Sequence, residues 1–261
     1  MNDEFLIIGA GLLLTIVALA AWGIIYYIFY AVRSQILGET IWRGREDTNA
    51  VAVTFDDGPS PDTEKLLDVL REKNVKATFF MIGKEVKKYP RIARRVAREG
   101  HEIGNHSYSH KIFLFCSRRR TDFEIYKTQE IISNLTGVAP RLIRPPCGAR
   151  SRSYFKKARK FMLETVQWSD TGYDWKYQTP EKIADAVLKT VKAGSIILLH
   201  DGDGEQKNNR RATVEAIPLI LNGLREKNLR VVSLETLCSK AEAENVPTKL
   251  INQTVNGEKC I

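Results

Sequence analysis

Short apolar runs rich in β-branched residues alternate with amphipathic stretches along most of this 261-residue chain. The apolar runs have the length and composition of buried strands, and the stretches between them have helical periodicity. This alternation predicts parallel strands with right-handed crossovers, hence an α/β barrel or a doubly wound sheet. The expected strands are 51–55, 77–82, 102–105, 142–145, 163–167, 196–200 and 230–233, and the expected helices are 62–73, 85–99, 119–136, 151–160, 180–192 and 213–227.

The N-terminal segment adds a second constraint. Residues 5–32 hold no charged side chain, and this run of 28 residues is long enough to cross a bilayer with some tilt. A cleaved signal peptide is the alternative, since Ala18-Leu19-Ala20 resembles a cleavage site, but the N-terminus is acidic and the apolar run continues past Ala20. We predict a retained transmembrane anchor that ends in an aromatic cluster suited to the membrane interface, Trp22, Tyr26, Tyr27, Phe29 and Tyr30.

The remaining boundaries follow from composition. We expect an N-terminal tail at 1–4, a juxtamembrane linker at 33–49, an α/β domain at 50–238 and a polar, poorly ordered tail at 239–261. The nearby positive charges all follow the anchor, and the positive-inside rule would then keep the domain in the cytoplasm. These charges are Arg33, Arg43 and Arg45, too few to fix the orientation.

Charge and cysteine content narrow the possible functions. The chain has 40 Lys and Arg against 31 Asp and Glu, and because residues 1–45 hold three of each sign, the net charge of +9 belongs to residues 46–261. Such an excess suits an anionic polymer or a membrane surface. The basic segments 91–98 and 118–120 lack interleaved aromatic residues, so we expect no nucleic-acid partner. No glycine-rich phosphate loop follows a strand, and the four scattered cysteines form no CxxC pair.

Two adjacent carboxylates, Asp56 and Asp57, follow the predicted strand 51–55 directly. Ligand chemistry collects at the carboxyl ends of parallel strands in α/β folds. Side chains alternate in direction along a strand, so one carboxylate can bind a metal while the other takes a proton. A surface turn with two solvated acids is the alternative.

Two histidines, His106 and His110, lie four residues apart just after the predicted strand 102–105. We expect this spacing to place both imidazoles on one side of a helical turn, where they can grip one ion. With a carboxylate they would form a His-His-Asp set that leaves metal positions open for water and substrate, as a hydrolytic site requires.

Three further strand ends carry candidate site residues. Arg144 precedes a Pro-Pro turn and can hold a buried carboxylate ionised. The segment from Trp168 to Trp175 offers rings on which a sugar can stack, with core packing as the alternative that we favour for Trp168. His200 ends an apolar strand, and with a reference pKa of about 6.5 its imidazole can donate a proton near neutral pH. Five strand ends therefore converge on one functional face.

The five segments resemble the motifs of the polysaccharide deacetylase family, and they occur in the family's order within residues 50–235. They read TFDDGPS, HSYSH, RPPCG, DTGYDW and LLH. The resemblance implies a distorted (β/α) barrel of about seven parallel strands, here preceded by one transmembrane helix. It also implies a metal-dependent hydrolase that removes N-acetyl or O-acetyl groups from amino-sugar polymers such as peptidoglycan or chitin-like polysaccharide.

The same resemblance assigns roles to individual residues. Asp56 would be the general base and His200 the general acid, with Arg144 tethering the base and Asp174 tuning the catalytic pair. A divalent metal, usually zinc in the family, would be held by Asp57, His106 and His110. The acetyl pocket would be lined by Trp175 and Leu198.

One residue departs from the family pattern. Cys147 occupies a position where the family usually has an aromatic residue. If only the backbone N–H of this residue serves, to stabilise the oxyanion, cysteine can replace the aromatic and widens the cleft. A thiol there can also bind the metal or oxidise.

Three alternative functions stay open at this level. A lipid-linked amino sugar deacylated at the membrane surface would suit a basic domain beside anionic lipid. A catalytically silent sugar-binding module could dispense with Asp56 or His200, yet both are present. An amidase for small metabolites fits poorly with an anchor. We expect a membrane protein with an extracytoplasmic catalytic domain, although the flanking charge leaves a cytoplasmic orientation open, and no partner protein is implied.

Overall fold

The computed structural model describes residues 2–176, 179–204 and 209–239. A parallel sheet with the strand order β5-β4-β3-β2-β1-β7-β6 forms the centre of the domain, and β8 pairs with the start of β1. The strands are β1 (Ala50–Asp56), β2 (Thr78–Met81), β3 (Glu102–Asn105), β4 (Leu142–Ile143), β5 (Glu164–Thr165), β6 (Asp170–Thr171), β7 (Ile196–His200) and β8 (Arg230–Val231). The predicted strands 102–105 and 196–200 are confirmed at both ends, and the other predicted strands are present with shifted ends.

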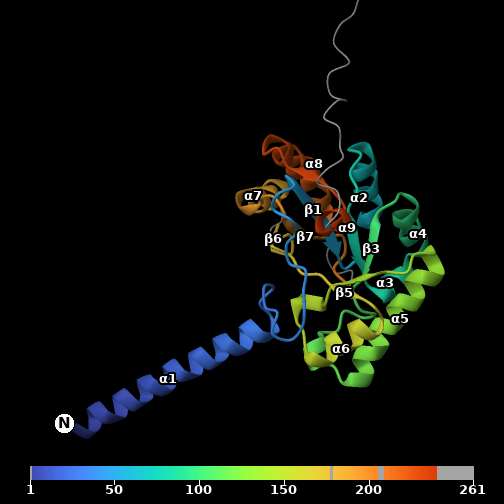
Figure 1. The fold of residues 1–261 in the computed structure, drawn as a ribbon. Helices are drawn as coiled ribbons and strands as arrows, with labels where there is room; N and C mark the ends of the chain where they lie inside the picture. The colour runs from blue at the N-terminus through green and yellow to red at the C-terminus, as the bar shows by residue number, and fades with distance from the viewer. Residues whose placement is uncertain (1, 177–178, 205–208, 240–261) are drawn as a thin grey trace, which may run out of the picture.

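Helices follow the strands around the outside of the sheet (Figure 1). They contact one another in the order α7-α8-α2-α4-α5-α6, which repeats the order of the strands they connect. The structure therefore has the expected distorted barrel architecture, which is open between β5 and β6. The helices are α2 (Pro61–Glu72), α3 (Gly83–Lys88), α4 (Pro90–Arg98), α5 (Arg118–Thr136), α6 (Arg152–Lys160), α7 (Pro180–Thr190), α8 (Arg211–Glu226) and α9 (Leu234–Cys238), with short 3-10 turns at Phe113–Phe115 and Pro146–Gly148.

Three details differ from the prediction. The expected helix 85–99 is two helices, because Pro90 takes the first position of α4 and disfavours helical geometry at Tyr89. Strand β6 was not predicted, since two residues are too short for a periodic signal. Helix α9 was also not predicted. From residue 240 onward the expected polar tail lies outside the described residues.

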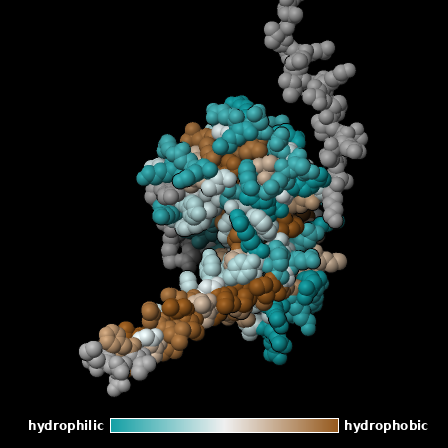
Figure 2. Space-filling view, turned by 60° about the vertical axis from the view of Figure 1, so that its left-hand side comes forward, coloured by the Kyte–Doolittle hydropathy of each residue, from teal (hydrophilic) through white to brown (hydrophobic). Residues whose placement is uncertain are grey.

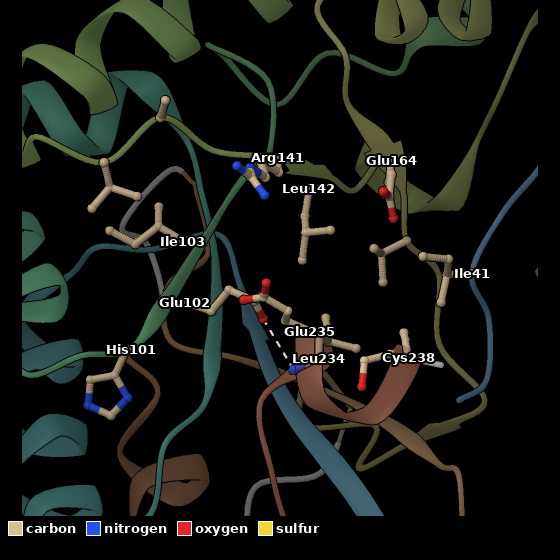
Figure 3. Close-up of a pocket in the computed structure, with 14 residues that line it drawn as sticks. Ile41, His101, Glu102, Ile103, Arg141, Leu142, Glu164, Leu234, Glu235 and Cys238 are labelled. Atoms are coloured by element: carbon tan, nitrogen blue, oxygen red, sulfur yellow. Dashed lines mark hydrogen bonds between the residues drawn. The ribbon is translucent and has the colours of Figure 1, made fainter. Parts of the chain in front are cut away.

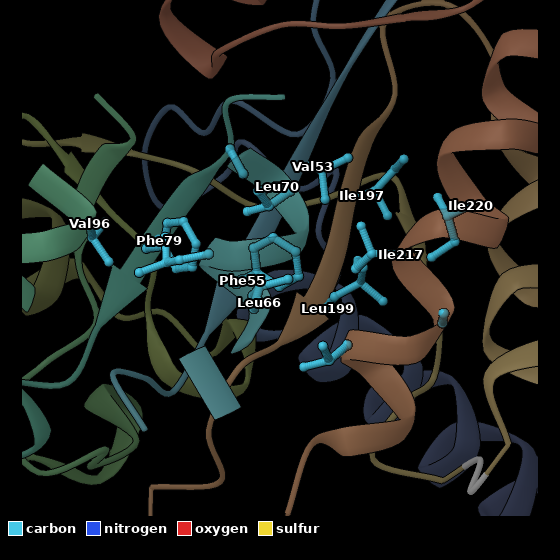
Figure 4. Packing of buried hydrophobic residues seen from close by; sticks show 14 of the residues in the cluster. Val53, Phe55, Leu66, Leu70, Phe79, Val96, Ile197, Leu199, Ile217 and Ile220 are labelled. Carbon is cyan, nitrogen blue, oxygen red and sulfur yellow. The ribbon is translucent and has the colours of Figure 1, made fainter. Parts of the chain in front are cut away.

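Alternation along β1 decides what each of its side chains contacts. Val53 and Phe55 join the core between the sheet and the helices, where the Phe55 ring stacks on Phe79 at 5.2 Å (Figure 4). Figure 4 also shows Leu66 of α2 and Ile217 of α8 packed on this side. Because neighbouring side chains point to opposite faces of a strand, Asp56 is directed to the inside of the barrel.

Helix α1 (Asn2–Phe29) extends away from the domain (Figure 1), and its surface is mostly apolar between its free end and the domain (Figure 2). Its segment Ile7–Phe29 has a mean hydropathy of 2.3 and no residue buried against the domain. It is long and apolar enough to cross a membrane, and a signal sequence would meet the same criteria.

The residues after α1 lie against the domain. Ile41 forms a parallel bridge with Val166, in line with β5 at the open edge of the sheet. Its amide donates to the Thr165 carbonyl at 2.8 Å, and its carbonyl accepts from Gln167 at 2.7 Å. Gly38 allows the Phe155 ring to approach closely, since a Cβ there would lie 2.4 Å from that ring. The chain is thus tied to the domain before β1 begins.

Candidate active site

The strand register brings the two proposed proton-transfer groups together. Asp56 ends β1 and is the register partner of His200, which ends β7. Adjacent strands lie about 4.8 Å apart, so both side chains occupy the same edge of the barrel interior. Asp57 follows with a left-handed φ of 74° and leaves the strand direction. Both carboxylates nevertheless face His106, whose Nε2 lies 3.7 Å from Asp56 Oδ2 and 3.4 Å from Asp57 Oδ1, so the opposite directions expected from strand alternation are not observed.

A buried Asp-His-His cluster lies beside Asp56. The Asp57 Oδ1 atom is 3.4 Å from His106 Nε2 and 3.1 Å from His110 Nε2. Tetrahedral ligands with bonds of about 2.0–2.1 Å lie about 3.3 Å apart, which these distances match. Asp57 Oδ1 is also buried with no hydrogen-bond partner among the described residues. A buried, unpartnered carboxylate oxygen is costly unless a cation compensates it, so the cluster fits a divalent metal.

The tautomer of His106 supports the same conclusion. Its Nδ1 lies 2.8 Å from the Arg144 carbonyl, which can only accept, so Nδ1 carries the hydrogen and Nε2 keeps its lone pair toward Asp57 and His110. Burial raises the pKa of Asp57, but the neighbouring imidazoles of His106, His110 and His200 outweigh it and hold that pKa below its usual range. Burial lowers the pKa of His110 and favours its neutral, ligating form.

The predicted helical turn at residues 106–110 is wrong. These residues form a loop with left-handed φ values at Ser107 and His110, 64° and 55°. Glu124 of α5 is fully buried and fixes the loop, since one of its oxygens accepts from the amides of Tyr108 and Ser109 at 2.8 and 2.7 Å. The imidazoles nevertheless converge, with ring centroids 5.2 Å apart. The spacing thus predicted that the two imidazoles lie together, but they are brought together by a loop and not by a helical turn.

Arg144 holds one oxygen of Asp56 in place. Its Nη1 donates to Asp56 Oδ1 and to Thr54 Oγ1, both at 2.7 Å, and its Nη2 donates to the Gln167 carbonyl at 2.9 Å. The guanidinium is fully buried and lies 4.1 Å from the Phe80 ring centroid. Asp56 Oδ2 is left facing the cluster, 3.7 Å from His106 Nε2. This oxygen is positioned to take a proton from a group bound next to the cluster.

Asp174 orients His200 through two contacts. Asp174 Oδ1 accepts from His200 Nδ1 at 2.8 Å, and Oδ2 accepts from the His200 amide at 2.7 Å and from Thr213 Oγ1 at 2.9 Å. Burial lowers the pKa of His200, but the charge and hydrogen bond of Asp174 raise it more, to about 9. Burial likewise raises the pKa of Asp174, and His200 lowers it below its usual range. His200 is therefore an imidazolium near neutral pH, with Nε2–H available as a donor.

The remaining predicted residues surround these groups. Leu198 is buried on β7, two residues before His200 and on the same face. Trp175 is half-exposed, and its ring lies edge-on to His200 with centroids 5.4 Å apart. Cys147 is exposed with φ of 55°, and desolvation together with the charges of Asp57 and Asp56 raises the pKa of its thiol. Among the described residues, the cluster of potential metal ligands does not include the Cys147 thiol.

Sequence reasoning missed Asp201, which supports the turn after β1. This buried carboxylate accepts from the Gly58 amide at 3.1 Å and from Thr63 Oγ1 at 2.6 Å, and burial raises its pKa to about 7. An acid directly after a strand-end histidine was a usable signal. Glu124 and Thr213 offered none, because each lies in an ordinary amphipathic helix.

A cavity of about 430 Å³ lies away from these groups, at the opposite end of the strands. Glu102, Leu142 and Glu164, which line it, are the first residues of β3, β4 and β5 (Figure 3). Asp56, His106, Arg144 and His200 are at or just past the carboxyl ends of their strands. Chemistry in parallel α/β sheets is built at the carboxyl ends, so the cavity is not the candidate site.

Comparisons with known proteins agree with this geometry. A family model described as polysaccharide deacetylase matches residues 43–166. A peptidoglycan-N-acetylglucosamine deacetylase of Bacillus cereus is 40% identical over 188 residues, which make up 72% of this chain and 67% of the relative. The crystal structure of the Bc1960 peptidoglycan N-acetylglucosamine deacetylase matches with a TM-score of 0.73 and 38% identity, over 76% of this chain and 92% of that chain. The chain belongs to the polysaccharide deacetylase family.

The same fold occurs in a protein described as inactive. A CE4 family pseudoenzyme from Bacillus anthracis matches with a TM-score of 0.70 and 28% identity, over 76% of this chain and 68% of that chain. The fold therefore does not decide activity by itself. The decision rests on the individual side chains at the site.

Proposed function

We propose that this protein is a metal-dependent deacetylase that removes N-acetyl groups from amino-sugar polymers of the peptidoglycan or chitin type. The single observation that carries the proposal is the placement of Asp56 and His200 as register partners beside the Asp57–His106–His110 cluster. Each has its own partner, Arg144 for Asp56 and Asp174 for His200. A silent sugar-binding module would need neither pair.

The cluster would hold the metal. One carboxylate and two imidazoles with remaining positions open are the donor set of hydrolytic zinc sites, so we propose zinc. When bound, zinc supplies a Lewis acid beside the scissile amide and makes water more acidic.

The chain's own residues would move the protons. Asp56 Oδ2 takes a proton from the attacking water, while Arg144 keeps Asp56 Oδ1 fixed. His200 Nε2 gives its proton to the departing sugar nitrogen, so that acetate and a free amine result. Asp174 holds His200 in the tautomer that this donation requires.

Substrate would be positioned by the residues around the cluster. The half-exposed Trp175 ring is available for a sugar face to stack on, and Leu198 offers an apolar surface to the acetyl methyl group. The Cys147 backbone N–H would stabilise the oxyanion. The small exposed side chain of Cys147 leaves more room there than an aromatic ring would.

We further propose that α1 is a retained single-pass anchor and that the catalytic domain lies outside the cytoplasm. Cleavage after Ala20 would leave an exposed apolar stub, since Trp22, Ile24 and Ile25 are each more than half exposed. A reporter that is active only outside the cytoplasm, fused to the C-terminus, tests the orientation. An inactive reporter would place the domain inside, where wall polymers are out of reach.

Acetate release from peptidoglycan and chitin oligomers by zinc-loaded protein tests the activity. We expect Asp56→Asn to abolish turnover and to keep the same zinc content as the wild type, because Asp56 is not one of the three clustered ligands. Equal turnover in the variant would reject Asp56 as the base. Zinc-loaded wild-type protein that releases no acetate from either polymer would favour the silent module.

A further inference from the structure

A groove of about 420 Å³ lies where α1 meets the catalytic domain. Its volume is within the range of about 300–1,000 Å³ typical of ligand pockets. One wall comes from the end of α1 and the residues after it, and the other comes from loops of the domain. The lining residues are Tyr26, Tyr27, Tyr30, Ala31, Val32, Arg33, Cys147 and Trp168.

The domain wall of this anchor groove adjoins the candidate active site. Cys147 is in the same loop as Arg144, three residues further along the chain, and Arg144 donates to Asp56 Oδ1 at 2.7 Å. The Trp168 ring lies 5.9 Å from the guanidinium of Arg144, the residue that binds Asp56. A molecule in the groove would therefore contact the same loops that hold the base.

The anchor wall is fixed to the domain. Arg150 is almost fully buried, its amide donates to the Phe29 carbonyl at 3.0 Å, and its guanidinium donates to the Ala31 carbonyl. The Tyr26 and Tyr30 rings stack with centroids 5.9 Å apart. The end of α1 is thus a built part of the groove, and it is more than a flexible tether.

The groove lies at the domain end of α1, and this location determines where the groove lies relative to the membrane. The apolar segment Ile7–Phe29 ends at the groove, and three tyrosines line the groove over its last turn and the residue that follows. Tyrosine is enriched at the membrane–water interface. Figure 2 shows the apolar surface of α1 continuing up to the domain. With α1 in a bilayer, the groove opens at the interface, beside the lipid headgroups.

We propose that the anchor groove is a subsite for substrate carried on a membrane lipid. This inference rests on the proposed deacetylase function and specifies its substrate: an N-acetylated amino sugar that is still joined through an anionic link to a lipid in the same bilayer. The tyrosine wall receives the membrane-proximal part of the substrate. Arg33 lines the groove with its guanidinium 4.8 Å from the Trp42 ring centroid, and it supplies a positive charge for the anionic link.

The test compares two substrates with the full-length, zinc-loaded protein in lipid nanodiscs. One is a synthetic N-acetylglucosaminyl phospholipid in the disc, and the other is a soluble N-acetylglucosamine tetramer. Tyr30→Ala should lower kcat/KM about tenfold for the lipid-borne sugar and leave it within twofold for the soluble tetramer. Trp22→Ala is the matched control, because Trp22 stacks on Tyr26 one turn further from the domain and does not line the groove.

A second variant protects the test against loss of packing in Tyr30→Ala. Val32→Trp fills the groove without removing a wall, and it should show the same selective loss. No loss in either variant, or an equal loss on both substrates, would overturn the proposal. A wild-type protein that deacetylates neither substrate would instead count against the proposed activity, so the two failures are distinguishable.

Discussion

The Asp174–His200 pair makes a sharp prediction about pH. A general acid works only while it is protonated, so activity should fall as pH rises through the pKa of His200, which Asp174 raises to about 9. Asp174→Asn removes the charge but keeps an oxygen that can accept from His200 Nδ1. The His200 pKa should then fall toward the ordinary value of 6.5. The alkaline limb of the kcat/KM profile should therefore shift to lower pH.

The expected size of the effect follows from the two pKa values. At pH 8 a group with a pKa of about 9 is ~90% protonated, and one with a pKa of 6.5 is ~3% protonated, so protonation alone predicts about a 30-fold loss. At pH 6 the same calculation gives a loss of less than about twofold.

Stability should change in the same variant with a defined sign. The pKa of His200 is higher in the folded protein than in the unfolded chain, so its stabilising contribution is full below pH 6.5 and is lost as pH rises through about 9. The difference between the two values corresponds to about 3 kcal/mol of unfolding free energy. Asp174→Asn should therefore lower the Tm most at pH 6 and least at pH 10.

The assay is acetate release from soluble N-acetylglucosamine tetramer between pH 5 and 10, with zinc content measured at each pH. Thr213→Val is the matched control, because it removes a hydrogen bond to Asp174 but leaves the carboxylate charge. We expect its alkaline limb to stay within a few tenths of a pH unit of the wild type, as the charge and not the hydroxyl raises the pKa. An unmoved limb in a folded, zinc-loaded Asp174→Asn variant would refute the assignment of His200 as the acid.

Two further predictions concern the metal cluster. His106→Ala should lower zinc stoichiometry in elemental analysis, since Nε2 of His106 faces Asp57 at 3.4 Å, and an unchanged stoichiometry would remove it from the ligand set. Glu124→Gln should weaken zinc affinity about 10–100-fold in a chelator competition, because the buried carboxylate holds the loop that carries both histidines. Glu130→Gln on the same helix is its control, as Glu130 pairs only with surface Lys127 among the described contacts, and equal affinity of both variants would contradict the positioning role of Glu124.

The sequence predicted the parts of the site that depend on local pattern. Apolar runs placed Asp56 and His200 at strand ends, whereas alternation did not predict that Asp56 and Asp57 both face His106. The pattern could not predict the loop at 106–110, because its left-handed residues are held by Glu124, which is distant in sequence. Thr213 escaped notice for the same reason, because its partner Asp174 is distant in sequence.

The juxtamembrane residues illustrate a different limit. A polar, helix-free stretch such as 33–49 has the composition of a linker, and nothing in its periodicity predicts contact with the domain. The contacts arise because β5 is the edge strand of the sheet. The Thr165 carbonyl and the Gln167 amide at this edge form hydrogen bonds with the backbone of Ile41. The requirement to pair edge backbone groups is a property of the whole sheet.

In the proposed mechanism, Asp56 and Asp57 have different tasks because their partners differ. Asp56 continues β1, so its side chain points into the barrel, where Arg144 is held by Thr54 and the Gln167 carbonyl. Asp57 has left the strand at a φ of 74°, and its Oδ1 lies within 3.4 Å of the His106 and His110 imidazoles. The backbone change between two adjacent residues would thus separate the proposed proton acceptor from the proposed metal ligand. An exchange of their roles would require a different backbone conformation. We therefore expect that neither carboxylate can take over the role of the other when that one is substituted.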